Sequence, residues 1–269
     1  MLLVYTSKIT PRLKFVFKQI CTRILNIPVS FTNVIEEFIA HDHLKMSYGS
    51  QPLGSEFFVR SNGLLSEQGL SDLELNVQTW EDTKCFFSSG EKSHIPFDIF
   101  AAAFYLLSRY EEYLPHVKDV YGRFTKEESL AFQSGFLHQP VIDIWAYKFK
   151  AALQKQYPTQ EFGVRRFSIN PVIDVPVAYY FKNKGFLRTL GGIGSDLFRF
   201  RFKFLYDRFP VLFGFKKDPY DNFKWIINRQ KTTQTKFNVF FLIGRLTTYD
   251  KNNSINKKEF LSLIKSVAD

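Results

Sequence analysis

Residues 1–40 alternate between strand-like and helix-like patterns, and this alternation limits the folds open to the chain. Leu2–Tyr5 is a short apolar run typical of a buried strand. Thr10 followed by Pro11 is typical of a helix start, and apolar side chains then recur at helical spacing to about Leu25. Val29–Thr32 has the pattern of a second strand. The opening is thus β-α-β, and we expect an α/β fold throughout.

A change of composition near residue 160 indicates two domains. A helix predicted from Asp143 to Tyr157 ends at Pro158, and Thr159–Arg166 has the composition of a linker. Residues 1–160 carry 16 Lys and Arg against 17 Asp and Glu, whereas residues 161–269 carry 20 against 9. We therefore predict a mixed α/β domain over 1–160 and a basic second domain over 161–269, whose charge favours an anionic partner.

The cysteines and the N-terminus indicate the compartment. Cys21 and Cys85 have no metal-type spacing and are expected to be two buried thiols of a reducing compartment. The N-terminus has no basic region and too short an apolar run for a signal peptide. No window reaches about 18 uninterrupted apolar residues, so no membrane span is predicted. These features predict a cytoplasmic protein.

The second part holds the most informative acidic residue. Phe167–Ile173 is predicted to be a strand that ends at Asp174, and Phe237–Ile243 a parallel strand buried on both faces. Asp218-Pro219 is expected to open a helix that runs to about Lys231. A carboxylate at the carboxyl end of such a strand is where β/α folds place active groups. On this feature alone, a strand-terminal or capping role for Asp174 is the favoured interpretation.

Several longer runs point to a family. The matching runs are Ile9–Leu13, Phe97–Ala102, Leu107–Pro115, Tyr121–Phe124, Gly135–Leu137, Gly185–Gly192 and Phe240–Gly244, together with the Asp174 strand. Over its whole length the sequence resembles bacterial polysaccharide deacetylases of the carbohydrate-esterase type that carry an uncharacterised N-terminal domain. The resemblance implies that residues 161–269 are the first half of a deacetylase-like β/α barrel. Phe167–Asp269 is 103 residues long, whereas a complete barrel takes about 200 or more, so the chain is expected to be truncated.

The resemblance also implies an activity: metal-dependent removal of N-acetyl groups from a surface or cell-wall glycan, which is hydrolysis of a non-peptide C–N bond. A divalent metal would activate water and Asp174 would be the catalytic base. The family motif has a second carboxylate where this chain has Pro176, and Arg245 stands where an acidic residue is usual. The family's histidine ligand lies beyond residue 269, and His41 and His43 are poor substitutes. No residue is therefore assigned as a metal ligand, and residues 1–269 are expected to be inactive as they stand.

Residues 182–217 are basic and aromatic. They hold nine Lys and Arg against two Asp, and Phe198–Phe204 alternates in a way that favours a strand. One interpretation is an insertion whose aromatic rings pack on the barrel while the charged tips reach water. The other is a binding surface for an anionic glycan, polymer or membrane surface, with Arg199, Arg201 and Lys203 as the binding residues. The alternative function is thus a non-catalytic binding protein; nucleic acid is not an expected partner.

Overall fold

A computed structural model describes residues 1–164, 166–244, 253 and 255–268. The chain divides into two compact units, Met1–Arg166 and Phe167–Asp269. Both units combine strands and helices, and their larger sheets are parallel, so the expected mixed α/β class is confirmed.

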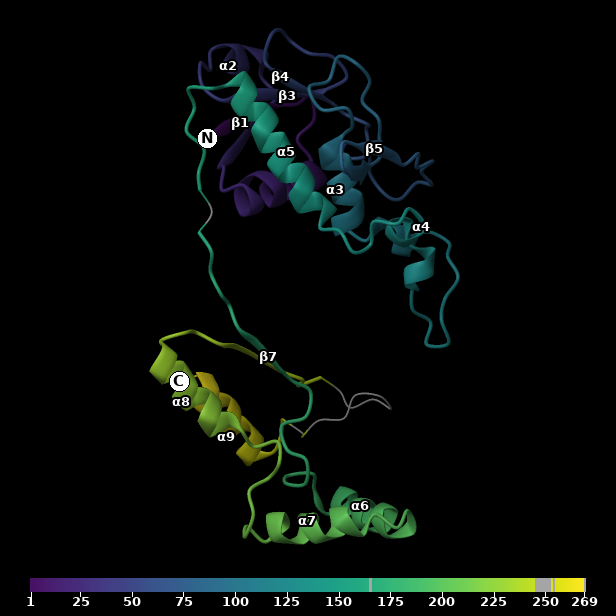
Figure 1. Ribbon diagram of the computed structural model, residues 1–269, viewed down its shortest axis with the longest axis vertical. Coiled ribbons are helices and arrows are strands. Elements are labelled where there is room, and N and C mark those ends of the chain that lie inside the picture. Colours follow the sequence, from purple (N-terminus) through teal and green to yellow (C-terminus); the bar gives the residue numbers. More distant parts are fainter. Residues whose placement is uncertain (165, 245–252, 254, 269) are drawn as a thin grey trace. The chain divides into compact units, whose positions relative to one another are not determined.

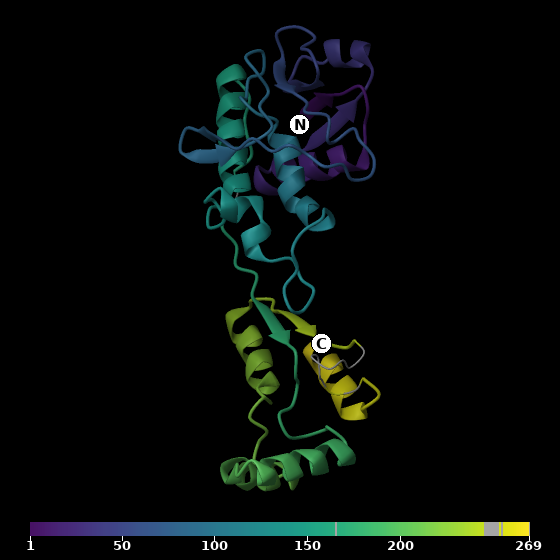
Figure 2. The same ribbon diagram turned by 90° about the vertical axis from the view of Figure 1, so that its right-hand side faces the viewer.

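A four-stranded parallel sheet is the centre of the first unit (Figure 1, Figure 2). Its strands are β1 (Leu2–Tyr5), β2 (Val29–Thr32), β3 (Lys45–Gly49) and β4 (Phe57–Arg60), in the order β2-β1-β3-β4. Leu2 pairs with Val29 and Leu3 with Lys45 in the parallel register. The predicted β-α-β opening is therefore correct.

Helices and one antiparallel hairpin complete the first unit. The helices are α1 (Pro11–Phe17), which continues as a π-helical segment η1 (Lys18–Ile24), α2 (Ile35–Ile39), α3 (Ile99–Leu107), α4 (Leu130–Gln133), α5 (Val141–Gln156) and the short 3-10 turns η2 (Tyr110–Tyr113) and η3 (Lys126–Glu128). The hairpin consists of β5 (Gln78–Trp80) and β6 (Thr83–Cys85).

Aromatic rings join these helices to one another and to the sheet. The Phe17 ring of α1 stacks on that of Phe100 of α3, with centroids 3.6 Å apart. The Phe57 ring of β4 meets that of Phe149 of α5 edge to face at 5.6 Å. Trp145 of α5 is completely buried. The high phenylalanine content thus serves a single contiguous core in this unit.

Side chains cap two helices of the first unit, and the first of these caps confirms the predicted helix start at Thr10. The Thr10 hydroxyl accepts the Leu13 N–H at 3.1 Å, and Pro11 takes the first helical position, where no N–H is needed. Asp98 is completely buried and caps α3 by accepting the N–H groups of Phe100 and Ala101. Each cap satisfies backbone donors that the first helical turn leaves without a partner.

The described residues of the second unit form two parallel strands and four helices. They are β7 (Val172–Val175), α6 (Phe186–Phe198), α7 (Phe202–Leu212), α8 (Phe223–Thr233), β8 (Asn238–Phe241) and α9 (Lys258–Ala268). Asp174 pairs with Phe240 across β7 and β8. Its small core consists of Val175, Ala178, Phe223, Phe260 and Leu263.

Both predicted strands of this unit are shorter than expected. Asp174 is the third residue of β7 rather than the residue after a strand over 167–173. The prediction that 237–243 is buried on both faces is wrong: β8 alternates, and the Phe240 side chain is 61% exposed. Among the described residues only β7 pairs with β8, so the other edge of β8 has no neighbouring strand.

The strand pattern of Phe198–Phe204 is also misleading. The segment is the junction of two helices: α6 ends at Phe198, Phe200 adopts a left-handed φ of 54°, and α7 begins at Phe202. The alternation of aromatic and basic residues therefore crosses the turn between two helices and does not belong to one continuous strand. Likewise, α8 begins at Phe223, because Asp218 binds a different part of the backbone.

Candidate functional site

Asp174 lies on the wall of a pocket in the second unit. The pocket has a volume of about 420 Å³, and its lining includes Asp174, Pro176, Tyr220, Asn222 and Ile226. Pairing of β7 with β8 holds the backbone of Asp174, and the side chain is exposed. The pocket therefore brings Asp174 and Pro176 together with polar groups more than 40 residues further along the chain.

The donor set of this pocket does not suit a metal ion. Pro176 has no side-chain donor, and Asp174 is the sole carboxylate among the described residues of the lining. No group of three or more His, Cys, Asp or Glu side chains across the described part of the chain can hold a metal. The His41 and His43 rings of the first unit lie 5.7 Å apart, edge to face, and belong to no such group. The divalent metal implied by the family resemblance thus has no ligand set among the described residues.

Asp218 organises the loop that follows β7, a role that the sequence did not predict. Its carboxylate accepts the N–H groups of Tyr180, Phe181, Lys182 and Tyr220 at 2.8–3.0 Å. Burial raises the pKa of Asp218 and the backbone donors lower it; the donors have the larger effect, so the pKa lies below the ordinary 3.8. The Asp218-Pro219 pair was the only local sequence feature that marked this position, and it indicated a helix start because such pairs are also common there.

A buried ion pair joins α6 to α7. Arg208 of α7 bonds Asp196 of α6, and both side chains are about nine-tenths buried. The Arg208 guanidinium also lies 5.0 Å from the centre of the Phe181 ring. Burial, and then the nearby charges of Arg208 and Arg188, lower the pKa of Lys184. The α6–α7 pair thus has a polar and charged interior.

The three predicted binding residues lie around the turn between these helices. Arg199 and Arg201 flank Phe200, and Lys203 follows in the first turn of α7; all three are exposed. The Arg201 guanidinium lies 5.9 Å from the centre of the Phe204 ring. The aromatic side chains beside them do not pack inward, because Phe198, Phe200 and Phe202 are exposed. The interpretation of an insertion that buries its aromatic rings is therefore wrong for these residues.

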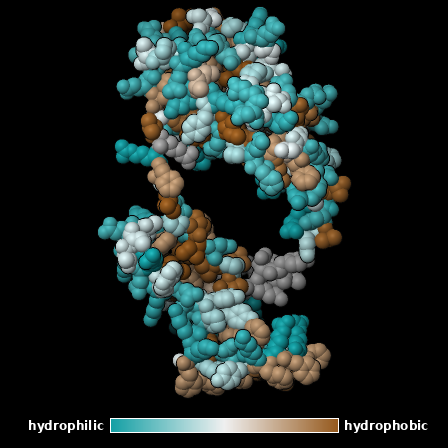
Figure 3. Space-filling view, in the orientation of Figure 1, coloured by the Kyte–Doolittle hydropathy of each residue, from teal (hydrophilic) through white to brown (hydrophobic). Residues whose placement is uncertain are grey.

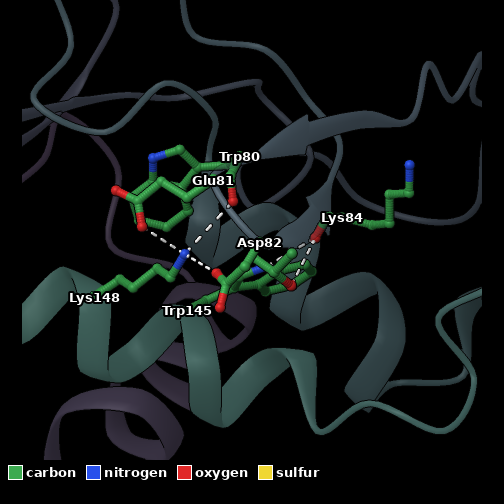
Figure 4. Close-up of polar contacts among 7 residues, drawn as sticks. Trp80, Glu81, Asp82, Lys84, Trp145 and Lys148 are labelled. Atoms are coloured by element: carbon green, nitrogen blue, oxygen red, sulfur yellow. Dashed lines mark hydrogen bonds and ion pairs between the residues drawn. The ribbon is translucent and has the colours of Figure 1, made fainter.

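The first unit has a charged cluster at the turn of its β5–β6 hairpin. Figure 4 shows Lys148 of α5 reaching between Glu81 and Asp82, and its ammonium also lies 5.0 Å from the centre of the Trp80 ring. On the same helix, Trp145 Nε1 donates to the Lys84 carbonyl at 2.9 Å. These contacts attach the hairpin to α5, so a positioning role accounts for the cluster.

A polar cavity of about 540 Å³ lies beyond α3. Its charged lining consists of Arg109, Glu112, His116, Lys118, Asp119 and Arg123. Arg109 pairs with Glu112, and Arg123 pairs with Asp119 at 3.0 Å. Both arginines are thus paired with carboxylates of the lining, and Lys118 is the positive side chain that remains beside these two pairs.

The model of a protein family of unknown function, DUF7033, matches residues 2–158, which include the whole sheet of the first unit and its α5 helix. No curated protein and no solved structure matches the chain.

Proposed function

Because residues 2–158 make the chain a member of the DUF7033 family, whose function is unknown, we propose a function from its second unit: deacetylation of an N-acetylated surface or cell-wall glycan. The observation that supports this proposal is the placement of Asp174 on a parallel strand, in the wall of a pocket. The resemblance of the sequence to polysaccharide deacetylases supplies the reaction class and the first half of a β/α barrel as the fold of this unit. We also propose the cytoplasm as the compartment, because both cysteines are free thiols.

In this proposal Asp174 is the catalytic base. Its carboxylate takes a proton from water as the water oxygen attacks the acetyl carbonyl carbon. The C–N bond then breaks, the nitrogen receives the proton that Asp174 took from water, and acetate and an amino sugar are the products. No step is assigned to a metal, because the described donors around Asp174 do not form a site for one, and residues 1–269 are therefore expected to lack the activity until a further donor is supplied.

The proline at 176 provides the test. Pro176 lines the same pocket as Asp174, so an aspartate there would place two carboxylates on one pocket wall. We expect Pro176→Asp in residues 1–269 to bind Zn²⁺ at least tenfold more tightly than the wild type by titration calorimetry. Asp174→Asn in that background should remove the gain. Release of acetate from N-acetylated chito-oligosaccharides should rise with Zn²⁺ affinity and stay at background in the wild type.

Pro158→Asp is the matched control, because it adds the same carboxylate at an exposed proline of the first unit. It should leave Zn²⁺ affinity unchanged. If Pro176→Asp behaves like this control, position 176 is not a ligand position and the deacetylase proposal is overturned.

A second candidate function is non-catalytic binding of an anionic glycan, polymer or membrane surface through residues 182–217. The observation that favours it is the exposure of Arg199, Arg201 and Lys203 beside exposed aromatic rings. Binding to a polyanion at low salt, lost at 0.5 M NaCl, tests it, because salt screens exposed charges within about 8–10 Å at 0.1–0.15 M. Absence of binding at low salt would exclude it.

A further inference from the structure

Helix α6 carries its apolar side chains on the face that is open to solvent. Leu187, Leu190, Leu197 and Phe198 recur at helical spacing with the small residues Gly191 and Gly194 between them, and all are exposed. The face turned toward α7 instead contains Gly192 and the buried Asp196. An amphipathic helix of a folded domain normally buries its apolar face, so this arrangement is inverted.

Helix α7 has the same inversion. Phe202, Tyr206, Phe209 and Phe213 follow the spacing i, i+4, i+7, i+11, which places them in one stripe, and all four are exposed. Its opposite side carries the buried Arg208 and Val211. In Figure 3, apolar side chains drawn in tan gather along the edge formed by α6 and α7 at the bottom of the view. We call the exposed apolar side chains of residues 186–215 the apolar edge; it contains Phe186, Leu187, Leu190, Leu197, Phe198, Phe200, Phe202, Phe204, Tyr206, Phe209, Phe213 and Phe215.

Basic side chains border the apolar edge. Residues 186–217 hold seven Lys and Arg against two Asp, and both aspartates already have a basic partner: Asp196 pairs with Arg208 and Asp207 with Lys216. The excess positive charge includes Arg199, Arg201 and Lys203 at the turn. A large exposed apolar patch marks an interaction site, and its basic border selects an anionic surface.

We propose that the α6–α7 hairpin lies in the headgroup region of an anionic phospholipid bilayer. Aromatic and leucine side chains on one face with Lys and Arg beside them are the features of helices that bind in the plane of a membrane interface. Helices of 13 and 11 residues are about 20 and 16 Å long, shorter than the roughly 30 Å hydrocarbon core. Consistently, no helix in the described ranges is long and apolar enough to cross a bilayer. This inference rests on the second candidate function, binding of an anionic surface, and not on the catalytic one.

Vesicle sedimentation of residues 1–269 tests the proposal. We expect binding to vesicles of 70% phosphatidylcholine and 30% phosphatidylserine at low salt, and at least tenfold weaker binding to pure phosphatidylcholine. Phe202→Gln with Phe209→Gln should lower the partition coefficient at least tenfold, because two rings no longer enter the interface. Neutralising Arg199, Arg201 and Lys203 to Gln should lower it about fivefold per residue.

Matched variants in the first unit control for charge and for apolarity. Lys14, Lys18 and Arg23 changed to Gln remove the same charge from exposed positions, and Val120→Gln removes an exposed apolar side chain. Both controls should bind vesicles as the wild type does. Circular dichroism of every variant checks that the helices are retained, and all substituted side chains are exposed, so the fold should persist.

Insertion itself can be measured with a single label. Cys21 and Cys85 are buried, so a cysteine introduced at Leu190 on the apolar edge, or at Ser195 on the polar side of α6, can be labelled selectively with an environment-sensitive fluorophore. Vesicles should shift the emission of the label at 190 to the blue and leave the label at 195 nearly unchanged.

Three results would overturn the membrane proposal. Equal binding to heparin and to lipid, with no effect of the Phe variants, would keep the second candidate function but remove the bilayer as the partner. A dimer that Phe202→Gln with Phe209→Gln converts to a monomer would identify a second copy of the chain as the occupant. No binding to anionic vesicles at low salt would exclude the bilayer, and the second candidate function would then depend on the polyanion assay alone.

Discussion

Truncation of Asp98 should destabilise the first unit strongly. The carboxylate accepts bonds from four donors at 2.7–3.1 Å, namely Tyr48 Oη and the N–H groups of Asn62, Phe100 and Ala101. Asp98→Ala leaves all four without this partner, and an unpaired buried donor costs about 1–3 kcal/mol. The lower value of about 1 kcal/mol for each donor applies if water enters the space that the side chain leaves. For four donors, the free energy of unfolding then falls by about 4 kcal/mol. The unfolding midpoint should then fall by roughly 8–16 °C.

Asp98→Asn should be intermediate. Its amide oxygen can still accept the two N–H groups of α3, and its amide nitrogen can donate to the Tyr48 hydroxyl, which leaves the Asn62 N–H alone without an acceptor. We therefore expect a loss of about 1–2 kcal/mol. Asp42→Ala is the control, because Asp42 is exposed; its effect should stay within about 0.5 kcal/mol.

Urea unfolding followed by tryptophan fluorescence measures these differences. Trp145 is completely buried in the first unit, whereas Trp225 of the second unit is 65% exposed, so the change in emission mainly reports the first unit. An alanine variant within 1 kcal/mol of the wild type, or an asparagine variant less stable than alanine, would refute the argument that Asp98 holds these segments together.

Three further predictions concern protons, helix packing and the hairpin. Burial raises the pKa of Asp98 from the ordinary 3.8 to about 6. Protonation of Asp98 therefore stabilises the fold fully below pH 4, and this contribution is lost as the pH rises through 6. Between pH 4 and pH 6 the urea midpoint of the wild type should fall relative to that of Asp98→Asn. Gly192→Ala should speed amide exchange in α6, because the new Cβ would stand 2.6 Å from Nη1 of the ion-paired Arg208. Gly194→Ala has open space around it, so it should slow exchange by raising the free energy of helix opening by about 0.5–1 kcal/mol. A change of the same sign in both variants would contradict this packing. Lys148→Met should lower the free energy of unfolding by less than about 1 kcal/mol, because both carboxylates that Lys148 bonds are exposed. The difference in urea midpoint from the wild type should vanish in 1 M salt. A larger loss that persists in salt would show that packing of the lysine stem contributes more than the ion pairs.

Local signals in the sequence predicted much of the first unit. Thr10 with Pro11, and Asp98, define helix starts through bonds to neighbours within three residues, so a short stretch of sequence is enough to recognise them. The predicted ranges of strands β1 and β2 are also correct, and β1 is a short apolar run.

The second unit was less predictable because its patterns depend on distant contacts. Phe198–Phe204 alternates like a strand, but the buried pair Arg208–Asp196 sets the rotation of both helices and turns the aromatic rings outward. Asp218-Pro219 looks like a helix start, yet its carboxylate binds backbone 36–38 residues earlier. The pocket beside Asp174 is likewise completed by Tyr220 and Asn222, whose proximity no local pattern encodes.

The bonds of Asp218 to the backbone at Tyr180, Phe181 and Lys182 bring the two ends of the α6–α7 segment to one point. Residues 183–217 are therefore an insertion into the strand–helix–strand framework of β7, α8 and β8, and the two ends of this insertion lie next to each other. Segments with adjoining ends tolerate replacement and transfer better than segments that bridge distant points. The hairpin can thus be exchanged for a short connection without altering the spacing of the framework, and its ends suit it for grafting into a surface loop of another protein.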